Sequence, residues 1–536
     1  MKRVQTTRAA ARIGASRMPA YAGQAGIDSA WSERPVSVAA RPALWFALIA
    51  AVATAVLALL VARFDPFMVM GLLLAVAALA VVVIRPGMAV GIVALVIYLN
   101  IPAILTQRYD IPEIAAGSII LLLGVPLVAH CVLRRRRLRG DRAFTMMLVF
   151  LGTLLLSSTV AIDKNLALGR VQGYVFEGIL LFWLILNVVR DLPSLRKMMV
   201  AFLAAGAVVS ALALYQDVSG NYSQDFGGLA YRNYDVARDG TLDTLAGART
   251  ERGRFDRAQG PVNEPNRFAQ IMVVLLPMAV YLIRTSRSQL FRGGVAVMGL
   301  LVLIGVVLTL SRGGIIALGL MALAMSAVGW IRTSRMAIGV AGVLFIVPVL
   351  TPFYMDRIAS ITNITYLVGN DGSTIREADG AMRGRLTEML AAFNVFLDHP
   401  LVGVGPGQFA PYYVQDYSRD PDIQFRDIRE ARRAHTLYFE LAAENGIIGL
   451  VSFMAIVLLL VQRLWKARKA LEHRLPGLAD LATACWLSLL AYLCTAVFLH
   501  MSYQRYYWLL LATAAAALHV VTSEAHRRGV GDSNGF

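Results

Sequence analysis

The chain has 536 residues, of which 57% are hydrophobic and only 16% are charged. This composition excludes an ordinary soluble globular protein and predicts an integral membrane protein. The formal net charge of +17 does not indicate nucleic-acid binding, because the basic excess lies in short loops between apolar runs, whereas acids slightly outnumber arginines in the two long polar loops.

Residues 1–42 contain basic residues but no apolar segment. They are predicted to form a disordered cytoplasmic extension, with a short amphipathic helix on the membrane surface as the alternative. They do not resemble a cleavable signal peptide, because the first apolar run begins late and is long enough to span a membrane.

Apolar runs long enough to cross a ~30 Å hydrocarbon layer as helices recur from Leu44 almost to the C-terminus. We therefore predict an all-α membrane protein with about fourteen transmembrane helices. The predicted spans lie near 44–62, 66–84, 88–105, 116–133, 143–161, 171–189, 198–217, 266–284, 294–310, 313–331, 336–353, 437–461, 480–499 and 504–521.

Lysine and arginine are enriched in short cytoplasmic loops, which predicts the orientation of the chain. With the N-terminus inside, every polybasic loop falls inside and both long polar loops fall outside. The predicted division is an extension (1–42), an N-terminal membrane bundle (43–217), an outer loop (218–265), membrane helices (266–353), a large outer loop (354–436), C-terminal membrane helices (437–521) and a cytoplasmic tail (522–536).

No metal or other cofactor is expected. Cys131, Cys485 and Cys494 all lie within predicted spans, so neither a disulfide framework nor a zinc site is indicated. Asp420 and Asp422 flank a proline in a DPD triplet, but Asp-Pro-Asp is a common turn and no nucleotide-binding domain accompanies it.

Two polar stretches lie at the outer ends of predicted spans. In RAQGPVNEPNRFA, the side chains of Arg257, Asn266 and Arg267 can line a polar site, although turn formation and helix capping explain the asparagine and prolines equally well.

Arg312, in TLSRGGIIALG, stands at a tight turn where a helix N-terminus adds partial positive charge. Snorkelling to the membrane surface is its alternative role.

The large outer loop contains a predicted helix over 383–400, in which Leu386, Leu390, Phe393, Phe396 and Leu397 recur at helical spacing. This helix is expected to lie in the membrane interface or to pack over the bundle. A glycine-rich turn, LVGVGPGQF (401–409), follows it.

Arg385 stands at the start of this helix, a position that favours anion binding. Its neighbour Arg383 competes for the same role, and a solvated helix start is the alternative for both arginines.

His435 stands at the entry to the next span, where Thr436 is a candidate N-cap and Glu440 and Glu444 lie one and two helical turns further on. A carboxylate held near an imidazole raises its basicity, so His435 is a candidate general base. Interfacial anchoring without chemistry explains it equally well. The flanking residues expected to contact a substrate are Arg432, Arg433, Tyr438 and Glu444.

Four segments, in this order, resemble the bacterial O-antigen ligase and polymerase family: SRGG, a GRL-containing loop helix, DHPLVGVGPGQF and AHTLYFELAAENGIIGL. The resemblance is strongest over about 254–460. It implies a GT-C-like fold, a periplasmic outer loop and a cofactor-independent glycosyltransferase in the bacterial inner membrane.

Such an enzyme transfers a glycan from an undecaprenyl-pyrophosphate carrier to an acceptor hydroxyl on a glycan or lipid-linked acceptor, with inversion. The family's two arginines and one histidine correspond to Arg312, Arg385 and His435. Thr436 stands where the family often has asparagine, which puts only a secondary contact in doubt.

Two other functions remain open. A polymerase uses the same chemistry with a second lipid-linked repeat unit as the acceptor, and the large number of predicted spans favours it somewhat. A transporter or flippase usually contains internal repeats and charges near the bilayer midplane, whereas here Glu177 is the main charged residue within a span.

Overall fold

The protein is described by a computed structural model. The structure describes residues 66–109, 117–133, 137–221, 257–262, 264–332, 380–421, 428–500 and 505–530, together with the single residues 111, 135, 226, 334, 423 and 425. The predicted extension 1–42, the spans 44–62 and 336–353, and most of the loop 218–265 lie outside these residues. The first part of the large loop, up to residue 379, and the end of the tail, beyond residue 530, do so as well.

The chain divides into two compact units, Met1–Leu72 and Leu73–Phe536, and α2 (Pro66–Ile84) crosses the boundary between them. The described residues of the second unit form helices and loops without a strand. The further α-helices are α3 (Ala89–Tyr98), α4 (Ile101–Tyr109), α6 (Gly124–Val128), α7 (Arg142–Ser158), α8 (Lys164–Gly173), α9 (Leu181–Val188), α10 (Leu192–Ser219), α11 (Pro265–Val273), α12 (Leu276–Thr285), α13 (Gln289–Leu308), α14 (Arg312–Ala327), α18 (Gly380–Asp398), α19 (Phe409–Tyr412), α20 (Leu437–Leu471), α21 (Pro476–Ala496) and α22 (Arg505–Arg527).

Seven helical segments within the described residues are long and apolar enough to cross a membrane. They are Lys164–Val188, Leu192–Ser219, Pro265–Thr285, Gln289–Leu308, Leu437–Leu471, Pro476–Ala496 and Arg505–Arg527. Shorter apolar helices cover Val69–Ile84, Pro86–Tyr98, Ser118–Cys131, Arg142–Ser158 and Arg312–Ala327. The all-helical membrane architecture is therefore confirmed, whereas the predicted count of fourteen spans remains a prediction.

One predicted span is interrupted. The run 88–105 does not form a single helix, because α3 ends at Tyr98 and α4 begins at Ile101. Asn100 between them has a φ of 60°, in the left-handed region that ends helices, and Pro102 occupies the first turn of α4, where a missing N–H costs nothing. Hydropathy does not register such a break, because both halves remain apolar.

Short polar side chains begin many of the helices by accepting hydrogen bonds from free backbone N–H groups. Asp163 and Asp191 cap α8 and α10 in this way, and Glu264 accepts from the N–H groups of both Asn266 and Arg267 at the start of α11. Pro265 is the first residue of α11, where its missing N–H leaves no helical hydrogen bond unmade.

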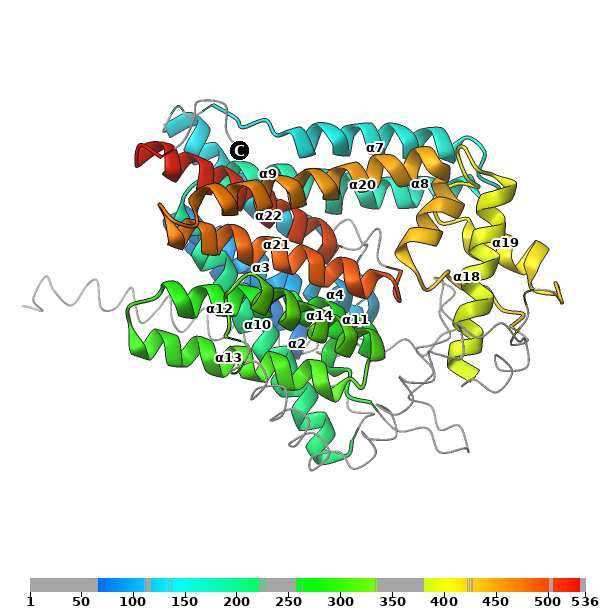
Figure 1. The fold of residues 1–536 in the computed structure, drawn as a ribbon, viewed down its shortest axis with the longest axis horizontal. Helices are drawn as coiled ribbons and strands as arrows, with labels where there is room; N and C mark the ends of the chain where they lie inside the picture. The colour runs from blue at the N-terminus through cyan, green and yellow to red at the C-terminus, as the bar shows by residue number, and fades with distance from the viewer. Residues whose placement is uncertain are drawn as a thin grey trace, which may run out of the picture. The chain divides into compact units, whose positions relative to one another are not determined.

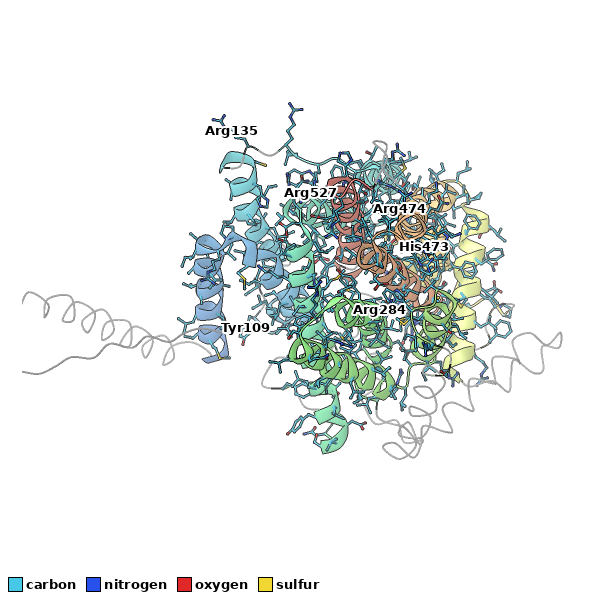
Figure 2. The ribbon with its side chains drawn as sticks, turned by 60° about the vertical axis from the view of Figure 1, so that its left-hand side comes forward. Tyr109, Arg135, Arg284, His473, Arg474 and Arg527 are labelled. Carbon is cyan, nitrogen blue, oxygen red and sulfur yellow. The ribbon has the colours of Figure 1, made fainter. Side chains whose placement is uncertain are left out.

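The contacts between helices define two ends of the bundle. At the first, called the basic end, Asp141 before α7 contacts Arg463 of α20 and His519 of α22, and Arg284 at the end of α12 contacts Asp480 of α21. Figure 2, in which the left-hand side of Figure 1 is turned forward, labels further basic side chains here, among them Arg474 and Arg527. The loops predicted to be cytoplasmic therefore meet at one end.

The opposite end, called the site end, contains the C-terminus of α7 and the N-terminus of α20. The hydroxyl of Ser157, near the end of α7, donates to the carbonyl of Glu444 at 2.7 Å. The side chain of Gln408 exchanges two hydrogen bonds with the backbone of Asp163, just before α8. The helices α18 and α19 lie at this end, beside the N-terminal part of α20 (Figure 1).

Helix α20 contains a kink at Gly446, which has φ 62° and ψ −169°. The glycine-rich turn packs into this kink, and a Cβ atom on Gly446 would lie only 2.2 Å from the carbonyl oxygen of Leu401. In return, the N–H groups of Val404 and Gly405 donate to the carbonyls of Ala443 and Glu444. This interlocked backbone holds the loop against the entry of α20.

The loop helix predicted over 383–400 is confirmed as α18, but it packs through a different face from the apolar stripe. Its buried residues include Ala391, Ala392 and Val395, which join a small core with residues of the glycine-rich turn and the segment before α20. The large stripe side chains are half-buried or exposed, and Leu390 among them packs against this core. Small side chains permit close packing of α18, and much of the stripe is left on the outside.

Candidate functional site

His435 lies buried at the site end, immediately before α20. Its backbone has a φ of 49°, a conformation that costs a non-glycine residue about 1–3 kcal/mol and clusters at functional sites. Its Nε2 lies 3.3 Å from Oε2 of Glu388 on α18, and both side chains are almost fully buried. The carboxylate that orients the imidazole therefore comes from the loop helix.

Glu440 and Glu444, the carboxylates expected one and two turns beyond His435, have contacts of their own. Glu440 accepts hydrogen bonds from the guanidinium of Arg433, and Glu444 lies a further turn along α20. The reason is local geometry: because His435 has a positive φ and precedes the helix, the periodicity of α20 does not extend to its side chain. Thr436 occupies the N-cap position, but its side chain makes no capping hydrogen bond.

A second imidazole lies next to the first. The rings of His435 and His500 meet edge to face with centroids 5.3 Å apart. His500 follows α21, is 4% exposed, and has no hydrogen-bond partner on either ring nitrogen among the described residues. A buried polar atom left without a partner typically costs about 1–3 kcal/mol.

Arg312 is brought to the same region by the start of α14. Ser311 caps this helix by accepting from the N–H of Gly314, and Leu310 before it has a φ of 51°. A Cβ atom on Gly313 would lie 3.1 Å from the ring of Phe498, two residues before His500. The half-buried Arg312 therefore lies beside the segment that carries the second imidazole.

Arg383 and Arg385 lie in the first described turns of α18 and are both half-buried. Arg385 precedes Glu388 by three residues, so the two side chains project from neighbouring positions on one side of the helix. The Nε of Arg383 is buried and has no hydrogen-bond partner among the described residues. The helix that orients His435 thus also presents arginine at its N-terminal end.

Arg257, Asn266 and Arg267 form a supporting group next to α14. The guanidinium of Arg257 donates to the carbonyl of Thr309 at 2.7 Å and to Oδ1 of Asn266 at 2.9 Å. It thereby joins the end of α13 to the start of α11. Arg267 lies 3.6 Å from the capping carboxylate of Glu264.

The remaining predicted residues flank α20. Arg432 lies 3.7 Å from the carboxylate of Glu430. The hydroxyl of Tyr438 donates to the carbonyl of Leu493 on α21, which places this side chain between two helices. The carboxylate of Glu444 accepts from the N–H of Gly407 in the glycine-rich turn.

Sequence reasoning did not identify Arg170 of α8 as a site residue. Its side chain packs on the glycine-rich turn, because a Cβ atom on Gly407 would lie 3.0 Å from Cγ of Arg170. Its charge acts on both Glu444 and His500. Nothing in the sequence around Arg170 signals this role, since it depends on how α8 packs against a turn more than 230 residues away.

The site end carries a positive electrostatic character. Burial, together with the charges of Arg433, Arg267 and Arg170 and the ring of His435, lowers the pKa of His500 well below its usual value. Arg433 is paired with Glu440, and Arg170, Arg312 and Arg385 come from three different helices. Guanidinium groups gathered near an apolar boundary are suited to binding a phosphate group.

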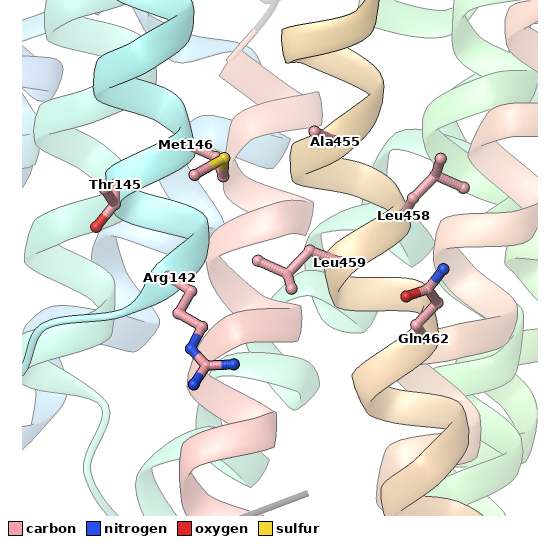
Figure 3. A pocket seen from close by; sticks show the side chains of 7 residues that line it. All are labelled: Arg142, Thr145, Met146, Ala455, Leu458, Leu459 and Gln462. Atoms are coloured by element: carbon pink, nitrogen blue, oxygen red, sulfur yellow. The ribbon is translucent and has the colours of Figure 1, made fainter.

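A pocket of about 400 Å³ lies elsewhere, between α7 and α20 (Figure 3). It is lined by Arg142, Thr145, Met146, Ala455, Leu458, Leu459 and Gln462. Arg142 begins α7 at the basic end, about 22 Å of helix away from Ser157 at the site end. This apolar groove is therefore separate from the paired imidazoles.

The remaining ionisable and metal-binding candidates have structural explanations. Glu177, the charged residue predicted within a span, lies in the π-helical segment Tyr174–Leu180 and is 3.5 Å from Arg505. Cys131, Cys485 and Cys494 are free thiols. Within the ranges that the structure describes, no group of three or more histidine, cysteine, aspartate or glutamate side chains is arranged to hold a metal ion.

The fold and the site define a multi-pass membrane protein with a buried histidine, a carboxylate and several arginines at one end of its helix bundle. Residues 296–454 match the family model described as O-Antigen ligase. This match supports the resemblance to the O-antigen ligase and polymerase family seen in the four motifs, over the part of the chain that it covers. A comparison with curated proteins finds no match.

The matched region covers under a third of the chain and includes Arg312, Arg385, Glu388 and His435. Arg170 and His500 lie outside it. The match supports a function of the O-antigen ligase or polymerase type in general, and part of the site comes from helices that the match does not cover.

Proposed function

We propose that the protein is an inverting, metal-independent glycosyltransferase that moves a glycan from an undecaprenyl-pyrophosphate carrier to an acceptor hydroxyl, with O-antigen ligase activity. The reaction takes place at the periplasmic face of the bacterial inner membrane, which is the site end of the bundle. The observation that carries this proposal is the buried contact between His435 and Glu388, on the same helix as Arg385 and beside the segment next to Arg312.

In the reaction, the bond between the anomeric carbon and the bridging phosphate oxygen breaks, and the undecaprenyl diphosphate leaves with additional negative charge. Arg312 and Arg385 bind this diphosphate, because guanidinium remains charged and forms two parallel hydrogen bonds with phosphate oxygens. Positive groups already in place before the reaction stabilise the developing charge without reorganisation.

The acceptor hydroxyl attacks the anomeric carbon from the opposite side, and His435 takes its proton. Nε2 of His435 lies 3.3 Å from Oε2 of Glu388, so we infer that the proton on Nε2 faces the carboxylate and that Nδ1 is the atom that accepts the acceptor's proton. The carboxylate holds the ring in this tautomer and stabilises the imidazolium that forms, as in other carboxylate–histidine pairs. A single displacement of this kind inverts the configuration of the anomeric carbon.

The carrier's polyprenyl tail remains in lipid beside α18. Phe393 and Leu397 on the outer face of this helix are 39% and 56% exposed, which is favourable only next to an apolar phase. The glycan reaches the buried imidazole from the periplasmic side, and the diphosphate lies between the two regions.

The test uses the purified full-length protein in nanodiscs with undecaprenyl-pyrophosphate-linked O-antigen as the donor. Arg312→Ala and Arg385→Ala are each expected to lower turnover by about 10²–10³. His435→Ala is expected to lower it by about 10²–10⁴. Matched controls at the basic end are Arg474→Ala and His473→Ala, which replace exposed side chains of the same types and should retain wild-type turnover.

Two acceptors are compared in this assay: lipopolysaccharide without O-antigen, and a second lipid-linked repeat unit. Transfer to the first supports a ligase, and chain extension on the second supports the polymerase alternative. Unchanged turnover after EDTA treatment is expected. Wild-type turnover in His435→Ala would show that His435 is not the base. Complete loss of activity on EDTA treatment would refute a metal-independent reaction.

A further inference from the structure

His500 is a buried side chain whose polar atoms have no role within the described protein. It is 4% exposed, and neither ring nitrogen has a hydrogen-bond partner among the described residues. Native proteins pair the large majority of buried polar atoms, and a side chain that breaks this rule needs an explanation such as a ligand.

The surroundings of His500 specify what kind of group it can bind. The charged and titratable groups that act on it are Arg433 before α20, His435, Arg267 of α11 and Arg170 of α8. Burial among these groups keeps the pKa of His500 well below its usual value, so the ring is neutral at physiological pH.

A neutral imidazole has one N–H donor and one acceptor lone pair. It adds no charge to the anion site formed by the arginines. A hydroxyl group, which both donates and accepts, is the partner that suits a neutral ring, and carbohydrates supply adjacent hydroxyl groups.

The position of His500 indicates which hydroxyl groups it meets. Its ring contacts that of His435 edge to face, with centroids 5.3 Å apart. Phe498 of the same segment packs on Gly313, next to Arg312. His500 therefore lies beside the proposed base, on a segment that packs next to one of the proposed diphosphate ligands.

We propose that His500 is a carbohydrate-binding residue that hydrogen-bonds hydroxyl groups of the acceptor sugar, next to the hydroxyl that His435 deprotonates. This inference rests on the proposed transferase function and adds a residue outside the family match to the acceptor site. His500 acts as a positioning residue, and the proton is transferred to His435.

The test compares the full-length wild-type protein with His500→Leu and His500→Gln in nanodiscs, with undecaprenyl-pyrophosphate-linked O-antigen as the donor. The acceptors are lipopolysaccharide without O-antigen and a second lipid-linked repeat unit. His500→Leu removes both hydrogen bonds and should raise the acceptor KM about tenfold or more, with kcat within about threefold of wild type. His500→Gln retains a donor and an acceptor and should restore much of the loss. His473→Leu, at an exposed position of the basic end, is the matched control.

Thermal unfolding without substrate separates binding from a structural role. Because His500 forms no hydrogen bond with the described protein, the Tm of His500→Leu should equal or exceed that of wild type. A Tm several degrees lower, or an unchanged acceptor KM, would overturn the inference. If His435→Ala is inactive while His500→Leu binds the acceptor normally, only the role of His500 fails. If the wild type uses neither acceptor, the proposed function fails and this inference fails with it.

Discussion

Glu388→Gln is the substitution that tests the proposed catalytic pair most directly. It replaces the buried carboxylate beside His435 by a neutral amide of nearly the same size. The amide fills nearly the same space, so the packing of α18 against the site is preserved. What the variant loses is the negative charge that stabilises a protonated ring.

The magnitude follows from the separation of the two groups. At an effective dielectric constant of about 20, opposite unit charges 3.3 Å apart attract by about 5 kcal/mol. This is an upper limit, because the imidazole carries only part of a charge in the transition state. A loss of about 3 kcal/mol corresponds to a decrease in kcat of roughly 10²-fold.

The assay measures glycan transfer at saturating donor and acceptor concentrations, so that kcat is read without interference from binding. The KM for the donor should change little, because Glu388 contacts the base and not the diphosphate. Glu472→Gln, a partly exposed carboxylate at the basic end, is the control and should retain wild-type kcat. A kcat within threefold of wild type in Glu388→Gln would refute the coupling between this carboxylate and the base.

Three further predictions concern the walls of the site and the opposite end of the bundle. Arg170→Ala should raise the KM for the donor about tenfold in the same transfer assay, because it removes a charge above the glycine-rich turn; an unchanged KM would exclude Arg170 from the site. Gly446→Ala should lower the free energy of unfolding by about 2 kcal/mol or more, measured by denaturation in detergent, because its φ is 62° and its Cβ would collide with Leu401. Asp141→Asn should remove part of the acid sensitivity of the Tm. Burial alone raises the pKa of Asp141, but the hydrogen bond and charge of His519 and the charge of Arg463 hold this pKa below its usual value. The contribution of Asp141 to folding stability is therefore present above about pH 3.9 and is lost as the pH falls through the lower pKa of the folded state.

Much of the fold follows from local sequence patterns. The apolar runs predicted most of the helices, and Ser311 and Pro265 indicated where α14 and α11 begin. Such signals are readable because capping and helical periodicity depend on residues within a few positions of one another. The break at Asn100 was missed, because hydropathy averages over a window longer than a turn.

The large apolar side chains of α18 predicted the helix, but they did not predict which of its faces packs on the protein. Periodicity correctly predicted the helix, but the face that packs on the protein carries Ala391, Ala392 and Val395. In a membrane protein, large apolar residues are not driven inward, because lipid accommodates them as well as the protein core does, and small residues form the close helix contacts. Apolar residues at helical spacing therefore identify the helix, but they do not identify its buried face in a membrane protein.

The sequence by itself determined that this is a helical membrane protein, and it identified Arg312, Arg385 and His435 as candidates through short motifs. Only the tertiary structure decided that Glu388 supports the imidazole, and that His500 and Arg170 join the site from helices distant in sequence. The physical reason is that a motif consists of residues within one turn or helix. The partner of a buried polar group, in contrast, depends on how distant segments pack against one another. Such packing depends on interlocking contacts, such as the glycine-rich turn in the kink of α20, that no local pattern encodes.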